Sequence, residues 1–249
     1  MVSRPKLSVV LPCYNEVNNI KKGVLNSIYS YLSLQPFTWE VCIVDDGSTD
    51  DSGNLIQTFI KKHQGFTLIE NKHLGKAKAV TRGVLEARGE IVLFSDFDQA
   101  TPLSEIKTLM PYFPAYDIVI GSRKDQRKGA PFSRRVMAKG FMMLRNVLLG
   151  LGVEDTQCGF KTFKREQARL LFKKLRLYRD RRYVSGSSVT AGFDVELLYV
   201  ARKLGYSIKE VPVVWKYVET RRVSAIRDSW EGLRDLVRIK VNDIRGVYE

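Results

Sequence analysis

The sequence predicts an α/β fold with a Rossmann-like, mostly parallel central sheet and helices on both faces. Two observations carry this prediction: short apolar strands alternate with helical segments, and several of the strands end in a polar cluster. The 249 residues, 44% hydrophobic and 27% charged, are enough for a sizeable core. Ligands of such a sheet bind beyond the carboxyl ends of the strands, where the polar clusters gather.

The elements are expected in strand–helix alternation. β-Branched-rich apolar runs predict strands at 7–11, 41–44, 67–70, 91–95 and 117–121, and helical spacing predicts helices at 17–34, 50–62, 76–87 and 136–149. The basic segments 123–135 and 176–192 are expected to be loops. Between Ile226 and Tyr248, apolar residues recur every three or four positions, which is typical of an amphipathic helix.

The formal charge of +14 is unevenly distributed. Residues 1–120 hold 12 basic and 13 acidic side chains, whereas residues 121–249 hold 29 and 14. The total alone indicates a nucleic-acid or anionic-membrane partner. No nucleic-acid recognition motif is present, and the acidic residues gather at the predicted strand ends, so we expect no nucleic acid. Three widely spaced cysteines form no zinc or redox motif and are typical of a reducing, cytosolic setting.

Three strand ends carry the chemistry. They are Pro12–Glu16, Asp45–Asp50 and Asp96–Gln99. Each alone has a plainer interpretation, since Ser48 is a good helix cap and two aspartates on a loop are usually solvated. Together, however, their carboxylates converge on one sheet edge, where a cation or a hydrogen-bonding ligand is needed to offset repulsion and desolvation.

In this order and at this separation, the clusters resemble those of family 2 glycosyltransferases of the GT-A fold. Within that family the chain, from Leu7 to about Ser224, is most similar to the dolichyl-phosphate (polyprenyl-phosphate) sugar synthases. The segments Asp155–Lys161 and Phe193–Leu198 resemble the dolichyl-phosphate β-glucosyltransferase branch. The resemblance implies a catalytic domain at 1–225, with a nucleotide and metal half (1–120) and an acceptor half (121–225), followed by a basic amphipathic interfacial helix at 226–249.

The resemblance also implies site residues. The metal, Mg²⁺ or Mn²⁺, is expected on Asp96 and Asp98, with Gln99 as a further ligand. The catalytic residues are expected to be Asp98, Asp194 and Arg123. The residues expected to bind the nucleotide sugar are Pro12, Tyr14, Glu16, Val44, Asp45, Asp46, Lys76, Asp96 and Phe97. Those expected to bind the acceptor phosphate are Arg123, Arg134, Arg221 and Arg222.

The activity implied is inverting transfer of a hexose from a nucleotide sugar, with UDP-glucose favoured, to a polyprenyl or dolichyl phosphate, giving a β-linked lipid phosphosugar. Asp194 is either a base, a ligand of the sugar hydroxyls or a structural ion-pair partner. Two alternatives stay open: a GDP-mannose-dependent dolichyl-phosphate mannosyltransferase and a family 2 enzyme with a non-lipid acceptor.

A membrane surface is the other expected partner. The helix at 136–149 and the stripe from Ile226 to Tyr248 are apolar with basic flanks, as in helices that lie on an anionic leaflet. Peripheral binding to the cytoplasmic face is therefore expected. Because many relatives carry transmembrane helices after this domain and the chain as given ends there, we expect any such anchor to be missing or to belong to a partner subunit.

Overall fold

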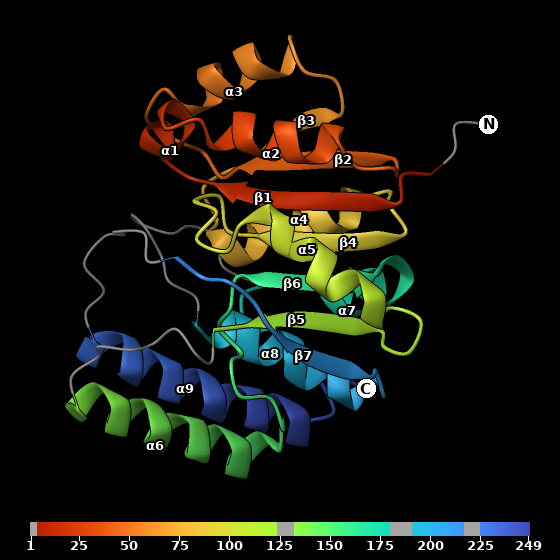
Figure 1. The fold of residues 1–249 in the computed structure, drawn as a ribbon. Helices are drawn as coiled ribbons and strands as arrows, with labels where there is room; N and C mark the ends of the chain where they lie inside the picture. The colour runs from red at the N-terminus through yellow and green to blue at the C-terminus, as the bar shows by residue number, and fades with distance from the viewer. Residues whose placement is uncertain (1–3, 124–131, 180–190, 217–224) are drawn as a thin grey trace.

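A seven-stranded sheet forms the centre of the computed structural model, which describes residues 4–123, 132–179, 191–216 and 225–249. Its strand order is β3-β2-β1-β4-β6-β5-β7 (Figure 1). The strands are β1 (Leu7–Cys13), β2 (Trp39–Asp45), β3 (Phe66–Glu70), β4 (Ile91–Ser95), β5 (Ile118–Ser122), β6 (Phe160–Lys164) and β7 (Ile208–Pro212). Neighbouring strands are parallel except at β6, which is antiparallel to both β4 and β5. The predicted mostly parallel α/β sheet is confirmed.

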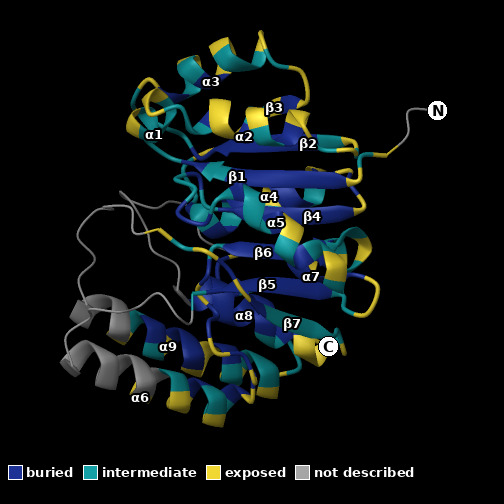
Figure 2. Cartoon of the chain, in the orientation of Figure 1, coloured by how far each residue is buried: buried dark blue, intermediate teal, exposed yellow. Residues whose placement is uncertain are grey.

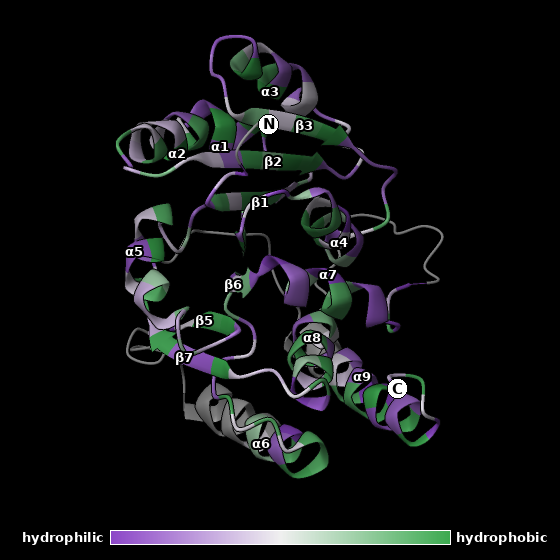
Figure 3. Ribbon diagram, turned by 90° about the vertical axis from the view of Figure 1, so that its right-hand side faces the viewer, coloured by the Kyte–Doolittle hydropathy of each residue, from purple (hydrophilic) through white to green (hydrophobic). Residues whose placement is uncertain are grey.

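Helices cover both faces of this sheet. The α-helices are α1 (Val17–Lys21), α2 (Val24–Ser33), α3 (Ser52–Ile60), α4 (Lys76–Glu86), α5 (Ile106–Leu109), α6 (Phe132–Leu149), α7 (Arg165–Lys174), α8 (Ala191–Lys203) and α9 (Ala225–Ile244). Two short 3₁₀ helices, Leu103–Glu105 and Met110–Tyr112, flank α5. Seen along the sheet in Figure 3, α2 and α5 lie on one side and α4, α7 and α8 on the other.

The core explains why the strands are almost continuously apolar. In β1, Leu7, Val9 and Leu11 pack into the cluster under α2 and α5, whereas Val10 points into the opposite cluster with α4, α7 and α8. A strand with helices on both faces must bury both sets of side chains. Figure 2 shows the central strands as uniformly buried.

The structure differs from the sequence-based expectation in three places. The single helix expected at 17–34 is wrong, because Gly23, at φ +83°, separates α1 from α2. Strands β6 and β7 were not expected, since their charged residues hide the apolar pattern. Helices α7 and α8, which lie within residues 165–203, were not expected.

Helices α6 and α9 pack together beside α8, beyond the β5 side of the sheet (Figure 1). Most of the apolar stripe expected on the last helix is not its packing face: Trp230 is 70% and Ile244 75% exposed, while Leu236 and Ile239 are buried. Tyr248 lies beyond the helix and is buried. None of the described helices is long and apolar enough to cross a membrane.

Candidate functional site

The first part of the site is the β1/β2 rim, which we define as residues 12–16, 45–50 and 71–75. Asn15 ties two of its loops together: its Oδ1 accepts hydrogen bonds from the backbone N–H groups of Thr49 (2.8 Å) and Asp50 (3.3 Å). Its own N–H donates to Ser48 Oγ at 2.9 Å. Asn15 has a φ of +55°, a conformation that asparagine tolerates better than most residues. The two strand ends are therefore fixed to each other.

Asp46 is the most enclosed carboxylate of the rim, 2% exposed. Its Oδ1 accepts from Asn71 Nδ2 (3.2 Å) and the Leu74 N–H (3.1 Å), and its Oδ2 from the Gly75 N–H (2.7 Å). His73 Nδ1 lies 3.0 Å from the same Oδ2. Asp46 thus holds the 71–75 loop against the end of β2.

The neighbouring Asp45 accepts from the Ser48 N–H (3.0 Å) and hydroxyl (2.6 Å) through Oδ1. Asp45 and Ser48 therefore form a turn at this strand end, but Ser48 does not cap the next helix, because the N-cap of α3 is Asp51.

An aromatic stack lies on the rim. The rings of Tyr14 and His73 are 4.0 Å apart at an angle of 10°. His73 was not among the expected site residues, and its only sequence signal is its place after β3. Pro12 and Glu16 are partly exposed beside Tyr14. The side chains of Val44 and Phe97 are buried in the two core clusters, so these residues offer the rim their backbone only.

The second part of the site is the β4 centre, which we define as Lys76, Asp96, Asp98 and Asp194. Lys76 Nζ donates to Asp96 Oδ1, and both side chains are about one-third exposed, at 32% and 40%. Burial acts to lower the pKa of Lys76, but the carboxylates of Asp96, Asp194 and Asp98 outweigh it and raise that pKa. The structure therefore brings together four of the expected residues from three separate elements.

Asp98, the second member of the Asp-x-Asp pair, is partly buried. Its Oδ1 accepts from the Ala100 N–H at 3.0 Å. Burial, with a contribution from the Asp96 carboxylate, raises the pKa of Asp98. A cation bound beside Asp98, in addition to the Lys76 ammonium, would offset both the burial of this carboxylate and its repulsion by Asp96.

The donor set fits a hard divalent cation. Among the described residues no three His, Cys, Asp or Glu side chains gather in a metal-binding arrangement. Two carboxylates completed by phosphate oxygens are, however, what Mg²⁺ or Mn²⁺ takes in nucleotide sites. Gln99, at φ +53°, donates through Nε2 to Ser95 Oγ and Asp96 O, and its Oε1 is buried without a hydrogen-bond partner. Because Gln99 Oε1 has no hydrogen-bond partner, it is available as an oxygen ligand for the cation.

Space beside Asp96 is restricted by Gly159. A Cβ at Gly159 would overlap the Asp96 carboxylate, and the Asp96 N–H donates to Gly159 O at 3.1 Å. Only a residue without a Cβ therefore fits at position 159, where the chain passes the β4 centre.

Arg123, at the end of β5, is held by an acidic partner. Its Nε and Nη2 donate to the two oxygens of Asp155 at 2.8 and 2.7 Å, and its backbone N–H to Asp155 Oδ2 at 2.9 Å. The guanidinium lies 5.8 Å from the Trp215 ring. Burial acts to lower the pKa of Arg123, but the Asp155 carboxylate, with a smaller contribution from Asp96, raises it. Asp155 and Trp215 were not assigned roles from the sequence.

The other expected phosphate ligands are not described. Arg221 and Arg222 lie outside the described residues, and Arg134 belongs to the first turn of α6, whose side chains there are also outside them.

A groove on the described part of the chain lies away from this site. One groove of about 700 Å³ runs along the edge strand β3, between α3 and α4. Arg82, on its wall, donates to Glu86 Oε1 (2.9 Å) and Glu70 O (3.1 Å), which gives this arginine a structural role.

Comparison with known proteins agrees with this geometry. The model of the family described as Glycosyl transferase family 2 matches residues 8–172. A dolichyl-phosphate beta-glucosyltransferase of Dictyostelium discoideum is 33% identical over 98% of this chain and 76% of its own length. That of Homo sapiens is 31% identical over 98% of this chain and 77% of its own length.

Solved structures resemble the whole chain. Mannosyl-3-phosphoglycerate synthase from Rubrobacter xylanophilus has a TM-score of 0.68 at 19% identity, covering 97% of this chain and 74% of its own. Glucosyl-3-phosphoglycerate synthase from Mycobacterium tuberculosis, in complex with Mn²⁺, UDP and glucosyl-3-phosphoglycerate, has a TM-score of 0.62 at 20% identity, covering 94% and 80%. At these identities the likeness concerns the fold.

Proposed function

The chain belongs to glycosyl transferase family 2, has the GT-A fold and is a glycosyltransferase, and we propose that it transfers glucose from UDP-glucose to dolichyl phosphate. The transfer inverts the anomeric centre and gives a β-linked lipid phosphosugar. The observation that carries the proposal is the near full-length similarity to relatives named dolichyl-phosphate beta-glucosyltransferases. The strand-end chemistry supports it independently.

The β1/β2 rim binds the nucleotide. Tyr14 stacks on His73 through one ring face, and we propose that its other face takes the base. Pro12, Glu16 and Asp45 line the base and ribose pocket, with Val44 and Phe97 contributing backbone. Asp46 acts mainly by fixing the 71–75 loop, because its carboxylate contacts Asn71, His73, Leu74 and Gly75 of that loop.

The β4 centre binds the diphosphate. Asp96 and Asp98 hold the divalent cation, Mg²⁺ or Mn²⁺, with Gln99 Oε1 as a further ligand. When bound, the cation neutralises the leaving diphosphate. Lys76 moves from Asp96 to a phosphate oxygen, since its ammonium and the cation compete for the same carboxylate. The solved relative with Mn²⁺ and UDP supports this assignment by fold.

The acceptor needs no protein base. A phosphate monoester has its second pKa near ~6 and is largely dianionic at neutral pH, so its oxygen can attack C1 directly. The bond from C1 to the diphosphate breaks as the bond from C1 to the acceptor oxygen forms. Arg123, with Arg134, Arg221 and Arg222, holds the acceptor phosphate beside the anionic donor. Catalysis then consists of positioning and charge stabilisation.

Asp194 is left for the sugar. Because the acceptor attacks without a base, we propose that the Asp194 carboxylate accepts a hydrogen bond from a hydroxyl of the transferred glucose.

The membrane surface is reached through α6 and α9. These helices carry exposed apolar side chains, namely Met143, Leu144, Val147, Trp230, Val237, Val241 and Ile244. The exposed Arg234, Arg238 and Arg245 lie among them on α9 and just after it, and each contributes about 1 kcal/mol on an anionic leaflet. We propose peripheral binding at the cytoplasmic face. Flotation with phosphatidylserine vesicles tests this: protein that stays unbound at low salt contradicts it.

Transfer of radiolabelled sugar into a lipid fraction tests the function. Purified protein is incubated with dolichyl phosphate, Mn²⁺ and either UDP-glucose or GDP-mannose. We expect label from UDP-glucose only, in a product whose β linkage is read by NMR. Asp98→Asn should lower the rate by about 10²–10³-fold, since one stabiliser of the leaving group is lost.

Other outcomes identify the alternatives. Label from GDP-mannose alone replaces the proposed donor, and label recovered only in a non-lipid acceptor replaces the proposed acceptor. Full transfer by the Asp98→Asn variant without added metal contradicts the metal site.

A further inference from the structure

A lysine is buried in the middle of the sheet. Lys161, in β6, is 0% exposed and lies between Phe94 of β4 and Ile120 of β5 in the strand register. Removing an ammonium from water is costly, and well-packed apolar side chains often fill such a place at no loss of stability. The fold by itself therefore does not require a lysine here.

The Lys161 ammonium has three close neighbours. Lys161 Nζ donates to Asp194 Oδ1 at 2.5 Å and to Cys158 O at 2.6 Å, and it lies 5.1 Å from the centre of the Phe94 ring. A lysine has three N–H donors, so these contacts fix the ammonium in one position. The ion pair is tight, with side-chain exposures of 0% for Lys161 and 11% for Asp194.

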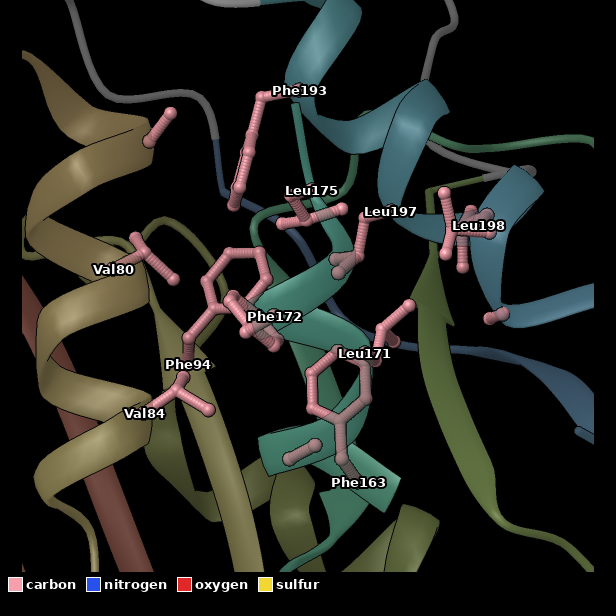
Figure 4. Close-up of a cluster of buried hydrophobic side chains, with 14 of the residues drawn as sticks. Val80, Val84, Phe94, Phe163, Leu171, Phe172, Leu175, Phe193, Leu197 and Leu198 are labelled. Carbon is pink, nitrogen blue, oxygen red and sulfur yellow. The ribbon is translucent and has the colours of Figure 1, made fainter. Parts of the chain in front are cut away.

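The backbone that carries Asp194 is equally fixed. Its neighbour Phe193 is 1% exposed and packs against Phe94 and Phe172, with ring centroids 6.3 and 6.2 Å apart. Figure 4 shows Phe193 pointing from α8 into the cluster that α4 and α7 line. The first turn of α8 is thus anchored on one side by Phe193 and on the other by the pair with Lys161.

The Asp194 carboxylate lies beside the β4 centre. Lys161, which binds its Oδ1, also donates to Cys158 O, and the next residue, Gly159, lies against the Asp96 carboxylate. Asp194 also contributes, after Asp96, to the raised pKa of Lys76. Its side chain is 11% exposed, and Lys161 binds Oδ1 of its two oxygens.

We propose that Lys161 is a positioning residue: it holds Asp194 Oδ1 so that Oδ2 accepts a hydrogen bond from one hydroxyl of the donor sugar. The inference rests on the proposed function only in taking the donor to be a sugar nucleotide. A carboxylate held in this way is an acceptor only, so it recognises a hydroxyl and rejects a sugar that lacks it.

A double-mutant cycle tests the inference. Lys161→Met, Asp194→Asn and the double variant are compared with the wild type, with Lys164→Met as the matched control. Lys164 is in the same strand, but it is 37% exposed and pairs with Asp117 at the far end. We measure kcat and KM for the sugar nucleotide, UDP affinity by calorimetry, and the melting temperature.

We expect Lys161→Met and Asp194→Asn each to lower kcat by on the order of 100-fold, because the hydroxyl contact is displaced. UDP affinity should change by no more than about 2-fold, because UDP lacks the sugar and the two sites are then independent. In the Asp194→Asn background, Lys161→Met should cause no further loss of kcat. Donor analogues deoxygenated at one position should supply a second signature: for one analogue, the wild type falls to the rate of the Lys161→Met variant.

Additive losses of kcat in the double variant, or unchanged kcat in Lys161→Met, overturn the inference. Lys161→Met leaves the buried Asp194 carboxylate without its partner and can therefore fail to fold. In that case kcat of the double variant, which buries neither charge, is compared with kcat of Asp194→Asn, and equal values support the inference. A wild type that uses another sugar nucleotide contradicts the proposed donor but not this inference, and the cycle is then measured with that donor.

Discussion

The β1/β2 rim and the β4 centre lie at the same edge of the sheet, but their carboxylates are balanced in different ways. In the rim, Asp45 and Asp46 accept hydrogen bonds from backbone and side-chain groups of neighbouring loops. In the β4 centre, Asp96 and Asp194 are each paired with a lysine. Neutral donors can stay in place when a ligand binds, whereas the lysine on Asp96 has to be exchanged if this carboxylate holds the proposed metal.

Within the β4 centre the two lysine pairs differ again. The Lys76–Asp96 pair is about one-third exposed, and the Lys161–Asp194 pair is almost fully buried. Exposure lets water replace a broken ion pair, so the first can exchange at small cost, while the second is part of the framework. The comparison predicts which changes affect binding and which affect stability.

The largest effect is expected at Lys76. Lys76→Met should weaken binding of UDP by roughly 10- to 100-fold, because a charge-assisted contact to the diphosphate is lost. The same variant should bind Mn²⁺ more tightly in the absence of nucleotide, since Asp96 no longer has a resident cation. Calorimetry with UDP and electron paramagnetic resonance with Mn²⁺ measure the two changes, with Lys78→Met as control. A change of both affinities in the same direction would contradict exchange at Asp96.

A smaller effect is expected at the rim. Asp46→Asn puts an amide where two oxygens now accept from Asn71, His73, Leu74 and Gly75. The free energy of unfolding should fall by roughly 1–2 kcal/mol, because at least one buried donor loses its acceptor. Urea denaturation measures this, and Asp51→Asn, on the exposed side of the rim, should be close to neutral. A neutral Asp46→Asn would show that the rim is not held by this residue.

The smallest effect concerns a buried carboxylate away from both regions. Glu196, in α8, accepts from the Leu177 N–H and the Tyr248 hydroxyl, each at 2.8 Å, and burial raises its pKa. The folded chain therefore holds this proton more tightly than the unfolded chain, so this contribution to stability is greatest at low pH. It is lost as pH rises from the ordinary value of 4.5 through the raised pKa.

Glu196→Gln should accordingly be more stable than the wild type at neutral pH, by about 1 kcal/mol, with the difference vanishing as the pH falls below the ordinary glutamate pKa. Urea denaturation between pH 4 and pH 8 is the measurement, and Glu86→Gln on the exposed side of α4 is the control. A gap between wild type and variant that is independent of pH would mean that Glu196 does not titrate in this range.

Much of the site was predictable because it is built from strand ends. The strands predicted at 7–11, 41–44 and 91–95 are apolar runs, and parallel strands bring their carboxyl ends to one edge. Pro12–Glu16, Asp45–Asp50 and Asp96–Gln99 could therefore be placed together without coordinates. Their roles toward nucleotide, metal and acceptor remain proposals.

The contacts that hold the side chains of Asp194 and Arg123 in place were not predictable from the sequence. Lys161 and Asp194 are 33 positions apart and meet because β6 runs antiparallel between β4 and β5. That strand contains two lysines, which hide its apolar period. Asp155 and Trp215 contact Arg123 from two other segments of the chain, whose sequences show no clear helical or strand periodicity.

Sequence alone determined the class of sheet, the edge at which the acidic clusters gather and the excess of positive charge in residues 121–249, because these depend on local periodicity and composition. Only the tertiary structure decided which lysine pairs with which aspartate and which apolar face of α9 packs against the core. It buries Leu236 and Ile239 and leaves Trp230 and Ile244 exposed. Pairing and burial depend on residues distant in the chain, and no local pattern records them.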